Sequence, residues 1–151
     1  MPDEQPLNQQ GRPTRKTKGI TAELRVAVEL LNNGFSVSWP FGDMEGYDLI
    51  ADSRNRLTRI QVKSIQTPNS TGTFRVSFRK GHSHTRRYDL NDADFFVAAL
   101  GYPEGWAFYV IPVEKASSNA VFFQPNQHPR HPDKWKTCKM EKYRARWDLL
   151  R

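Results

Sequence analysis

The sequence contains one cysteine, no long apolar run and no excess of acidic residues. Because Cys138 has no second cysteine to pair with, an internal disulfide and a thiolate zinc cluster within one chain are both excluded. No apolar stretch approaches the roughly 18–20 residues that cross a membrane, and the polar start, MPDEQPLNQQ, lacks the apolar core of a signal peptide. We therefore expect a cytoplasmic protein without a membrane partner.

Basic residues outnumber acidic residues by 23 to 16, which gives 151 residues a formal net charge of +7. A surplus of this size favours polyanionic partners, first among them nucleic acid, although an ordinary basic protein has the same composition. The hydrophobic and aromatic shares, 37% and 12%, argue against global disorder. The length suits one compact domain.

The N-terminal segment, residues 1–18, has no apolar periodicity and collects Arg15, Lys16 and Lys18 near its end. We interpret this segment as a flexible basic arm, which either lies along a phosphate backbone or stays solvated. Residues 19–151 then form the single folded domain.

Apolar residues recur at helical spacing after Gly19, and Gly34 is a natural stop. The pattern predicts a helix that ends at residues 32–34. Its predicted buried stripe consists of Ile20, Leu24, Ala27, Val28 and Leu31.

Shorter apolar or alternating runs follow the helix and predict strands. These strands are expected at residues 35–39, 46–51, 57–65, 74–78, 95–100 and 106–111. A short helical turn at 112–116, a proline-rich loop at 124–134 and a closing helix at 141–150 complete the expected order. A helix followed by a run of strands indicates an α/β or α+β layer.

Two acidic residues occupy positions where a carboxylate needs a reason. Glu23 falls at the edge of the predicted buried face, where its charge is costly without a partner, for example Arg59. Asp48 follows Gly46 at the start of a short β run, although Asp is a poor strand former. The capping of a turn is the simpler explanation of Asp48.

Gln61 and Lys63 share one face of the predicted strand 57–65, opposite the apolar Ile60 and Val62. Exposure of this face to water would explain them. Two acids and an amide oxygen around one point also suit Mg²⁺, which prefers oxygen ligands. A lysine beside them can hold the attacking water or offset charge on a phosphate, which is the equipment for phosphodiester hydrolysis. A structural ion cluster has the same composition.

The order of a helix Glu, an Asp at the head of a strand and a polar-x-Lys in the next strand resembles the PD-(D/E)XK nuclease superfamily. Within it, GITAELRVAVELLNNGFSVSWPFGDMEGYDLIA, IQVKSIQ, YDLNDADFF and GWAFYVIP are most similar to the group I intron-associated homing endonucleases. The resemblance implies an α/β core of a mixed β-sheet flanked by helices. It also implies a magnesium requirement, cleavage of double-stranded DNA, assembly into a homodimer or homotetramer, and a nucleoid-associated location in bacteria or organelles.

By this resemblance Glu23, Asp48 and Gln61 are metal ligands, and Lys63 is the catalytic lysine. Tyr47 stands where the motif has Pro, and Gln61 stands where it has Asp or Glu, which removes one negative charge from the expected metal cage. A Gln in this place is also found in the intron-associated group, so we interpret the set as a variant active site. A Holliday-junction resolvase and a catalytically inactive DNA-binding module are the alternatives.

Residues 75–87 carry five cations and no acid, which favours contact with phosphates over a merely solvated face. The five cations are Arg75, Arg79, Lys80, Arg86 and Arg87. Alternation along the predicted strand places Arg75 and Arg79 on one basic face. His82 and His84 have a spacing that could chelate a metal, but a loop tip is the better interpretation.

Overall fold

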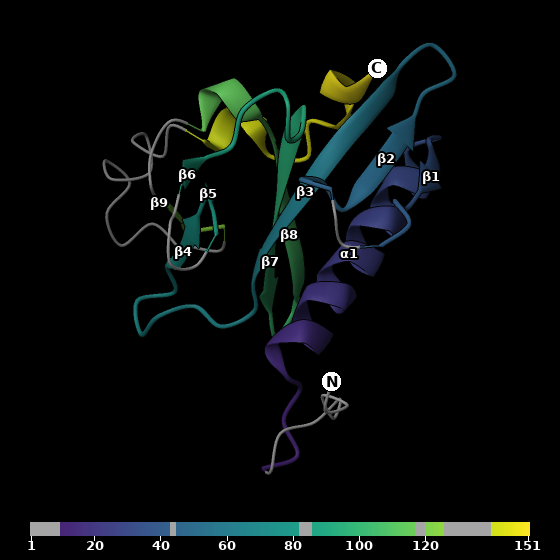
Figure 1. The fold of residues 1–151 in the computed structure, drawn as a ribbon. Coiled ribbons are helices and arrows are strands. Elements are labelled where there is room, and N and C mark those ends of the chain that lie inside the picture. The colour runs from purple at the N-terminus through teal and green to yellow at the C-terminus, as the bar shows by residue number, and fades with distance from the viewer. Residues whose placement is uncertain (1–9, 43–44, 82–85, 117–119, 126–139) are drawn as a thin grey trace.

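The computed structural model describes residues 10–42, 45–81, 86–116, 120–125 and 140–151. A five-stranded sheet in the order β1-β2-β3-β7-β8 forms the centre of the fold (Figure 1). Its strands are Ser36–Ser38 (β1), Leu49–Asp52 (β2), Leu57–Ile65 (β3), Phe95–Tyr102 (β7) and Gly105–Pro112 (β8). The β3–β7 pair is parallel and the other pairs are antiparallel, which confirms the predicted α/β class with a mixed sheet.

The long central strand β3 has the bounds that its alternating pattern predicted. The hairpin of β7 and β8 also matches the prediction, with each strand slightly longer than expected. In contrast, β2 begins at Leu49 and not at Gly46. The segment before it bends, because Gly46 packs directly against the backbone of Asp92.

The helix α1 spans Arg15–Asn32 and begins before Gly19, where we expected its start. Thr14 caps the helix, since its Oγ1 accepts a hydrogen bond from the backbone N–H of Thr17 at 3.2 Å. This cap outweighs the low helix propensity of Gly19. The expected boundary between a flexible arm, 1–18, and a domain, 19–151, falls inside α1.

The face of α1 that packs on the sheet differs from the predicted stripe. The helix residues buried against the sheet are Ala22, Val26, Ala27 and Leu30. Four apolar residues of the predicted stripe are between 48% and 58% exposed: Ile20, Leu24, Val28 and Leu31. The prediction is wrong because small side chains let the helix lie close to β3 and β7, where Ile60 and Val97 complete the core. The larger side chains are left on the outer face.

The opposite face of the central sheet is covered by small sheets (Figure 1). These are the antiparallel pairs of β4 (Phe74–Ser77) with β9 (Ala120–Phe123) and of β5 (Arg79–Lys80) with β6 (Arg86–Arg87). Phe74 and Phe123 pack on Phe96 and Tyr109 of the central sheet. The helical turn expected at 112–116 is the 3-10 helix η1 (Val113–Lys115).

The closing helix expected at residues 141–150 is two separate 3-10 helices, η2 (Glu141–Tyr143) and η3 (Trp147–Leu150). Ala145 lies between them at φ 49°, a left-handed conformation that interrupts a continuous helix. η3 inserts Trp147 and Leu150 into the core on the side of α1, so the end of the chain closes the same face.

Some expectations fall on residues outside the described ranges. They are the pair His82 and His84 and most of the proline-rich loop at 124–134. Within the ranges that are described, no helix combines the length and the apolar content that a membrane crossing requires.

The buried face of α1 predicts how two leucines differ in their effect on stability. Leu30 is fully buried, so we expect Leu30→Ala to lower the free energy of unfolding by about 2–5 kcal/mol. Leu57 at the start of β3 is 67% exposed, so Leu57→Ala should change the free energy of unfolding by less than about 0.5 kcal/mol. Urea denaturation followed by circular dichroism measures both values. Equal losses would contradict the packing described for α1.

Candidate active site

The turn before β2 holds Asp48 against the middle of β3. The backbone N–H of Asp48 donates to the carbonyl of Ile60 at 2.8 Å. Oδ2 of its carboxylate accepts the backbone N–H of Val62 at 2.7 Å and Nε2 of Gln61 at 2.5 Å. Burial raises the pKa of Asp48, and the hydrogen bond from Val62 and the charge of Lys63 oppose the rise. Asp48 is thus fixed beside the polar face of β3.

Gln61 stands where the motif has a carboxylate, and its amide contacts Asp48. Its Nε2 donates to Asp48 and, at 3.2 Å, to the carbonyl of Val62. A carboxylate at position 61 would place a second negative charge beside Asp48, and repulsion would oppose the ionised pair. The amide instead donates a hydrogen bond to Asp48. This hydrogen bond lowers the pKa of Asp48, so Gln61 favours the ionised form of the acid.

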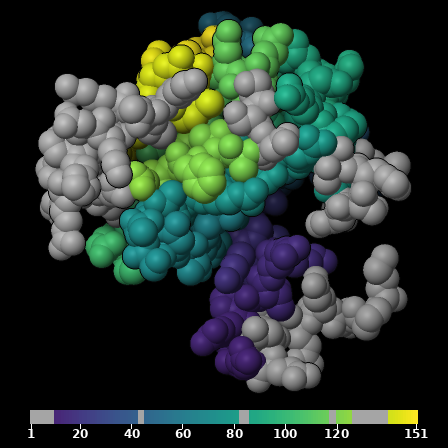
Figure 2. Space-filling view, turned by 90° about the vertical axis from the view of Figure 1, so that its left-hand side faces the viewer, coloured from purple at the N-terminus to yellow at the C-terminus, as the bar shows by residue number. Residues whose placement is uncertain are grey.

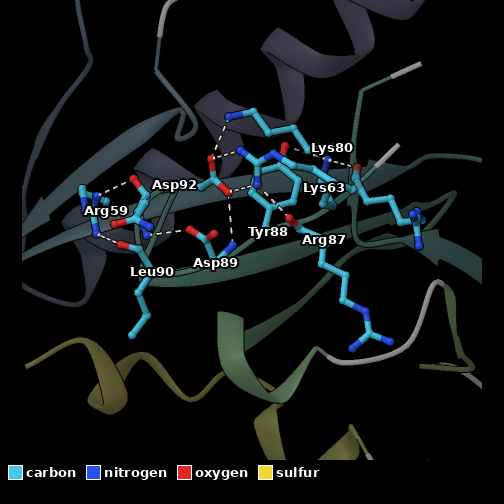
Figure 3. A network of polar contacts seen from close by, with 11 residues as sticks. Arg59, Lys63, Lys80, Arg87, Tyr88, Asp89, Leu90 and Asp92 are labelled. Atoms are coloured by element: carbon cyan, nitrogen blue, oxygen red, sulfur yellow. Dashed lines mark hydrogen bonds and ion pairs between the residues drawn. The ribbon is translucent and has the colours of Figure 1, made fainter. Parts of the chain in front are cut away.

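Lys63 is the next residue on the same face of β3, and its ammonium lies over the ring of Tyr88, 4.7 Å from the centroid (Figure 3). Its Nζ donates to the hydroxyl of Tyr88 at 3.2 Å and to the carbonyl of Arg79 at 3.4 Å. Burial lowers the pKa of Lys63, the charge of Asp48 raises it, and Lys80 adds to the lowering. Asp48, Gln61 and Lys63 are thus gathered on one strand face.

Glu23 of α1 reaches the same site from the helix. Glu23 and Asp48 both line a cavity of about 220 Å³, together with Trp39 and Tyr47. Arg59, the partner considered for Glu23, pairs with Asp94 instead, with Nη2 of Arg59 2.9 Å from Oδ1 of Asp94. The structure therefore places all four predicted catalytic residues around the junction of α1, β2 and β3.

A larger cavity of about 660 Å³ is lined by the β3 residues Val62 to Ile65. Lys63 lines it together with Arg15 and Lys18 from the first turns of α1. Figure 2 shows this start of the helix, in purple, projecting from the main body of the described residues. Three positive charges thus border one cavity beside β3, an arrangement that suits a phosphate backbone.

The oxygen donors at the site fit a hard divalent cation. The described part of the chain contains no group of three His, Cys, Asp or Glu side chains that could hold a metal. Glu23, Asp48 and Gln61 nevertheless offer two carboxylates and an amide oxygen. Among the described residues, both hydrogen bonds to the Asp48 carboxylate use Oδ2, so Oδ1 is left for a ligand. Mg²⁺ is commonly held by one or two carboxylates, with waters and substrate phosphates completing its shell.

The predicted phosphate-binding cations of residues 75–87 lie on three short strands. Phe74, Val76 and Phe78 are buried, whereas Arg75 on β4 is exposed and Arg79 at the start of β5 is half-buried. The alternation predicted for this segment therefore continues past the end of β4 at Ser77. Arg87 is exposed at the end of β6.

Asp92, which the sequence analysis did not single out, binds the other two cations of this segment (Figure 3). The carboxylate of Asp92 is 6% exposed and lies 2.7 Å from Nζ of Lys80 and 2.7 Å from Nη1 of Arg86. A Cβ at Gly46 would lie 2.9 Å from the Cα and Cβ of Asp92, so only glycine fits at position 46. The signal available in the sequence was the gathering of five cations without an acid in residues 75–87, since an acid nearby favours crowded like charges.

Comparisons with known proteins identify what the chain is similar to. The model of the PD-(D/E)XK endonuclease family matches residues 14–146 of the chain. The chain is also similar to a solved structure, that of the bacterial homing endonuclease I-Ssp6803I, with 29% sequence identity and a TM-score of 0.75. That match covers 91% of this chain and 93% of the other. No curated protein matches the sequence.

The ion pairs of Asp92 predict a pH-dependent contribution to stability. Hydrogen bonds from Arg86 and Lys80 hold the pKa of Asp92 well below its usual value, so the folded state favours the carboxylate. We expect Asp92→Asn to lower the free energy of unfolding by about 1–2 kcal/mol at pH 7, since hydrogen bonds to charged groups contribute this much when water partly screens them.

The sign of the pH effect follows from the lowered pKa. The contribution of the Asp92 carboxylate to the free energy of unfolding is complete above its unfolded pKa of about 3.9. It is lost as the pH falls toward the lower pKa of the folded state. The difference between wild type and Asp92→Asn should therefore be constant from pH 7 to 5 and narrow below about pH 4. Urea denaturation at each pH measures this difference in the free energy of unfolding. Asp148→Asn is the control, and its effect should be smaller because the Asp148 ion pair is exposed. A difference that widens in acid would contradict the assignment.

Proposed function

Since this chain belongs to the PD-(D/E)XK endonuclease family, we propose that it hydrolyses phosphodiester bonds at specific sites in double-stranded DNA and requires Mg²⁺. Membership of the family makes the chain an endodeoxyribonuclease. The observation that carries the proposal is the contact of Asp48 with Gln61 and Val62 on the strand that also presents Lys63.

The proposed mechanism gives each residue one task. Glu23 and Asp48 would hold the cation, and Gln61 would orient Asp48 and offer Oε1 as a further ligand. A bound divalent cation polarises the phosphate and lowers the pKa of a bound water. Lys63 donates a hydrogen bond to the attacking water or to a phosphate oxygen and offsets the negative charge that develops in the transition state. Arg15 and Lys18, on the wall of the larger cavity, hold the DNA backbone.

The similarity to a bacterial homing endonuclease supports the narrower proposal of an intron-encoded homing enzyme that acts on DNA in the cytoplasm, at the nucleoid. The roles of Arg75, Arg79, Lys80, Arg86, Arg87 and Lys16 as DNA contacts are part of the same proposal. Lys80 and Arg86 would contact a DNA phosphate while they keep their ion pairs with Asp92.

The proposal also includes assembly into a homodimer or homotetramer. One chain carries one site, so the cutting of both strands requires two copies or two turnovers, and a closed symmetric assembly supplies two sites at once. The outer face of α1 supports this part of the proposal, because Leu24 is 54% exposed there and Val28 is 51% exposed. Contiguous exposed apolar residues on a basic protein mark a surface for association.

The first test is cleavage by variants of the strand residues. We expect Lys63→Ala and Asp48→Asn each to slow Mg²⁺-dependent cleavage by at least about 100-fold, since each removes a group that acts on the developing charge or holds the cation. Binding to DNA should change little, because many other cations contact phosphates. The measurement compares plasmid and four-way-junction DNA, with Mg²⁺ or EDTA, and uses Lys115→Ala of η1 as an exposed control.

Each other outcome has a clear meaning. Unchanged cutting by either variant would contradict the assignment of the site. A strong preference for the four-way junction would identify a junction resolvase. Salt-sensitive binding without any cutting by the wild type would identify a catalytically inactive DNA-binding module.

The second test concerns assembly. Light scattering at micromolar concentration should give at least twice the mass of one chain, and Leu24→Glu should reduce that mass by placing a charge on the outer face of α1. Leu57→Glu is the matched control, since Leu57 is 67% exposed and lies on β3. A wild type that stays monomeric with and without DNA would exclude the proposed assembly.

A further inference from the structure

Tyr88 is the residue in closest polar contact with the catalytic lysine, and the motif does not include it. Its ring lies under the ammonium of Lys63, and its hydroxyl accepts a hydrogen bond from Nζ at 3.2 Å. The ring rests edge-on against Phe96, which is 1% exposed in the core, with ring centroids 5.1 Å apart. A lysine ammonium over a fixed aromatic face is attracted by the negative face of the ring.

Residues on both sides of Tyr88 are hydrogen-bonded to one buried acid, Asp92 (Figure 3). The guanidinium of Arg86 donates to both oxygens of Asp92, at 2.7 Å each. The backbone N–H of Asp89 donates to Oδ2 of Asp92 at 3.1 Å. Since these anchors stand two residues before and one residue after Tyr88, Asp92 fixes the place from which the ring projects.

The same acid also contacts the loop that carries Asp48. Gly46 lies so close to Asp92 that a Cβ on Gly46 would be 2.9 Å from the Asp92 backbone. Asp92 therefore connects the turn that presents Asp48 with the segment that presents Tyr88. Through these contacts Asp92 sets the position of the Asp48 carboxylate relative to the Tyr88 ring under Lys63.

We propose that Tyr88 is a positioning residue that holds the ammonium of Lys63 in place for DNA cleavage. The contacts of Asp92 fix the position of Tyr88 itself. This inference rests on the proposed function. A lysine side chain has four rotatable bonds, and Lys63 borders a cavity of about 660 Å³ into which it could swing. The ring and hydroxyl of Tyr88 restrict the ammonium of Lys63 to the space over the ring. A misplacement of about 1 Å in a reacting group can cost on the order of 100-fold in rate.

The hydroxyl of Tyr88 serves as an acceptor over the working pH range. Burial, followed by the charges of Asp48 and Asp92, raises the pKa of Tyr88 to about 12, so the phenol stays protonated. Its oxygen accepts from Lys63 while its O–H is available to a further acceptor, such as a phosphate oxygen of bound DNA.

Two variants separate the hydroxyl from the ring. Tyr88→Phe keeps the ring under Lys63 and removes the acceptor, and we expect the single-turnover cleavage rate to fall about 10-fold. Tyr88→Leu removes both, and the rate should fall about 100-fold. The dissociation constant for DNA, measured in EDTA, should change less than about two-fold in both variants, because Tyr88 acts through Lys63 and adds no charge. Tyr102→Phe, at the end of β7, is the matched control.

A second measurement follows Lys63 directly and needs no cleavage. The ring current of Tyr88 should shift the ε-methylene protons of Lys63 upfield in the NMR spectrum of the full chain, as assigned by their loss in Lys63→Ala. Tyr88→Phe should retain this shift and Tyr88→Leu should abolish it. The retained shift in Tyr88→Phe also shows that the variant is folded.

The outcomes that overturn the proposal are distinct. Wild-type cleavage rates in Tyr88→Leu, or an equal loss of rate and DNA affinity, would show that Tyr88 does not position the lysine. Absence of the ring-current shift in the wild type would show that Lys63 does not lie over the ring. Failure of the wild type to cut any DNA would overturn the proposed function, whereas the NMR shift would still decide whether Tyr88 holds Lys63.

Discussion

The hydrogen bonds between Asp48 and the middle of β3 are the interaction on which the rest of the site depends. An acid that precedes one strand accepts the backbone N–H of Val62 in the next, so the position of its carboxylate follows from the sheet. Because Gln61 and Lys63 occupy one face of that strand, the same contact decides how far Asp48 lies from both. A rigid strand positions a catalytic group more accurately than a loop does.

Gln61 shows how the site accommodates one carboxylate fewer. In a buried site two adjacent carboxylates repel, and a cation must hold them together. The amide donates a hydrogen bond to Asp48 in place of a second negative charge, so no carboxylate at position 61 repels Asp48. In the proposed mechanism Gln61 is thus a variant of the motif, and the chain belongs to the family that has this motif.

Asp92 offsets the repulsion among the positive charges near Lys63. A net charge of +7 helps a protein to associate with DNA, but cations that crowd around a buried lysine repel it. Asp92 receives Lys80 and Arg86, contacts Gly46 and anchors the backbone at Asp89. One buried acid thereby joins the basic segment to the loop of Asp48, and the proposed role of Tyr88 depends on these contacts.

The sequence determined the features that depend on neighbouring residues. Alternation along residues 57–65 predicted the bounds of β3 and the common face of Gln61 and Lys63, because side chains of a strand alternate whatever packs on it. Only the tertiary structure decided that α1 buries Ala22 and leaves Leu24 exposed, because periodicity defines a stripe but not which face meets the sheet. It also decided which acid Lys80 and Arg86 bind, because the run of cations in the sequence does not indicate which carboxylate folds against them.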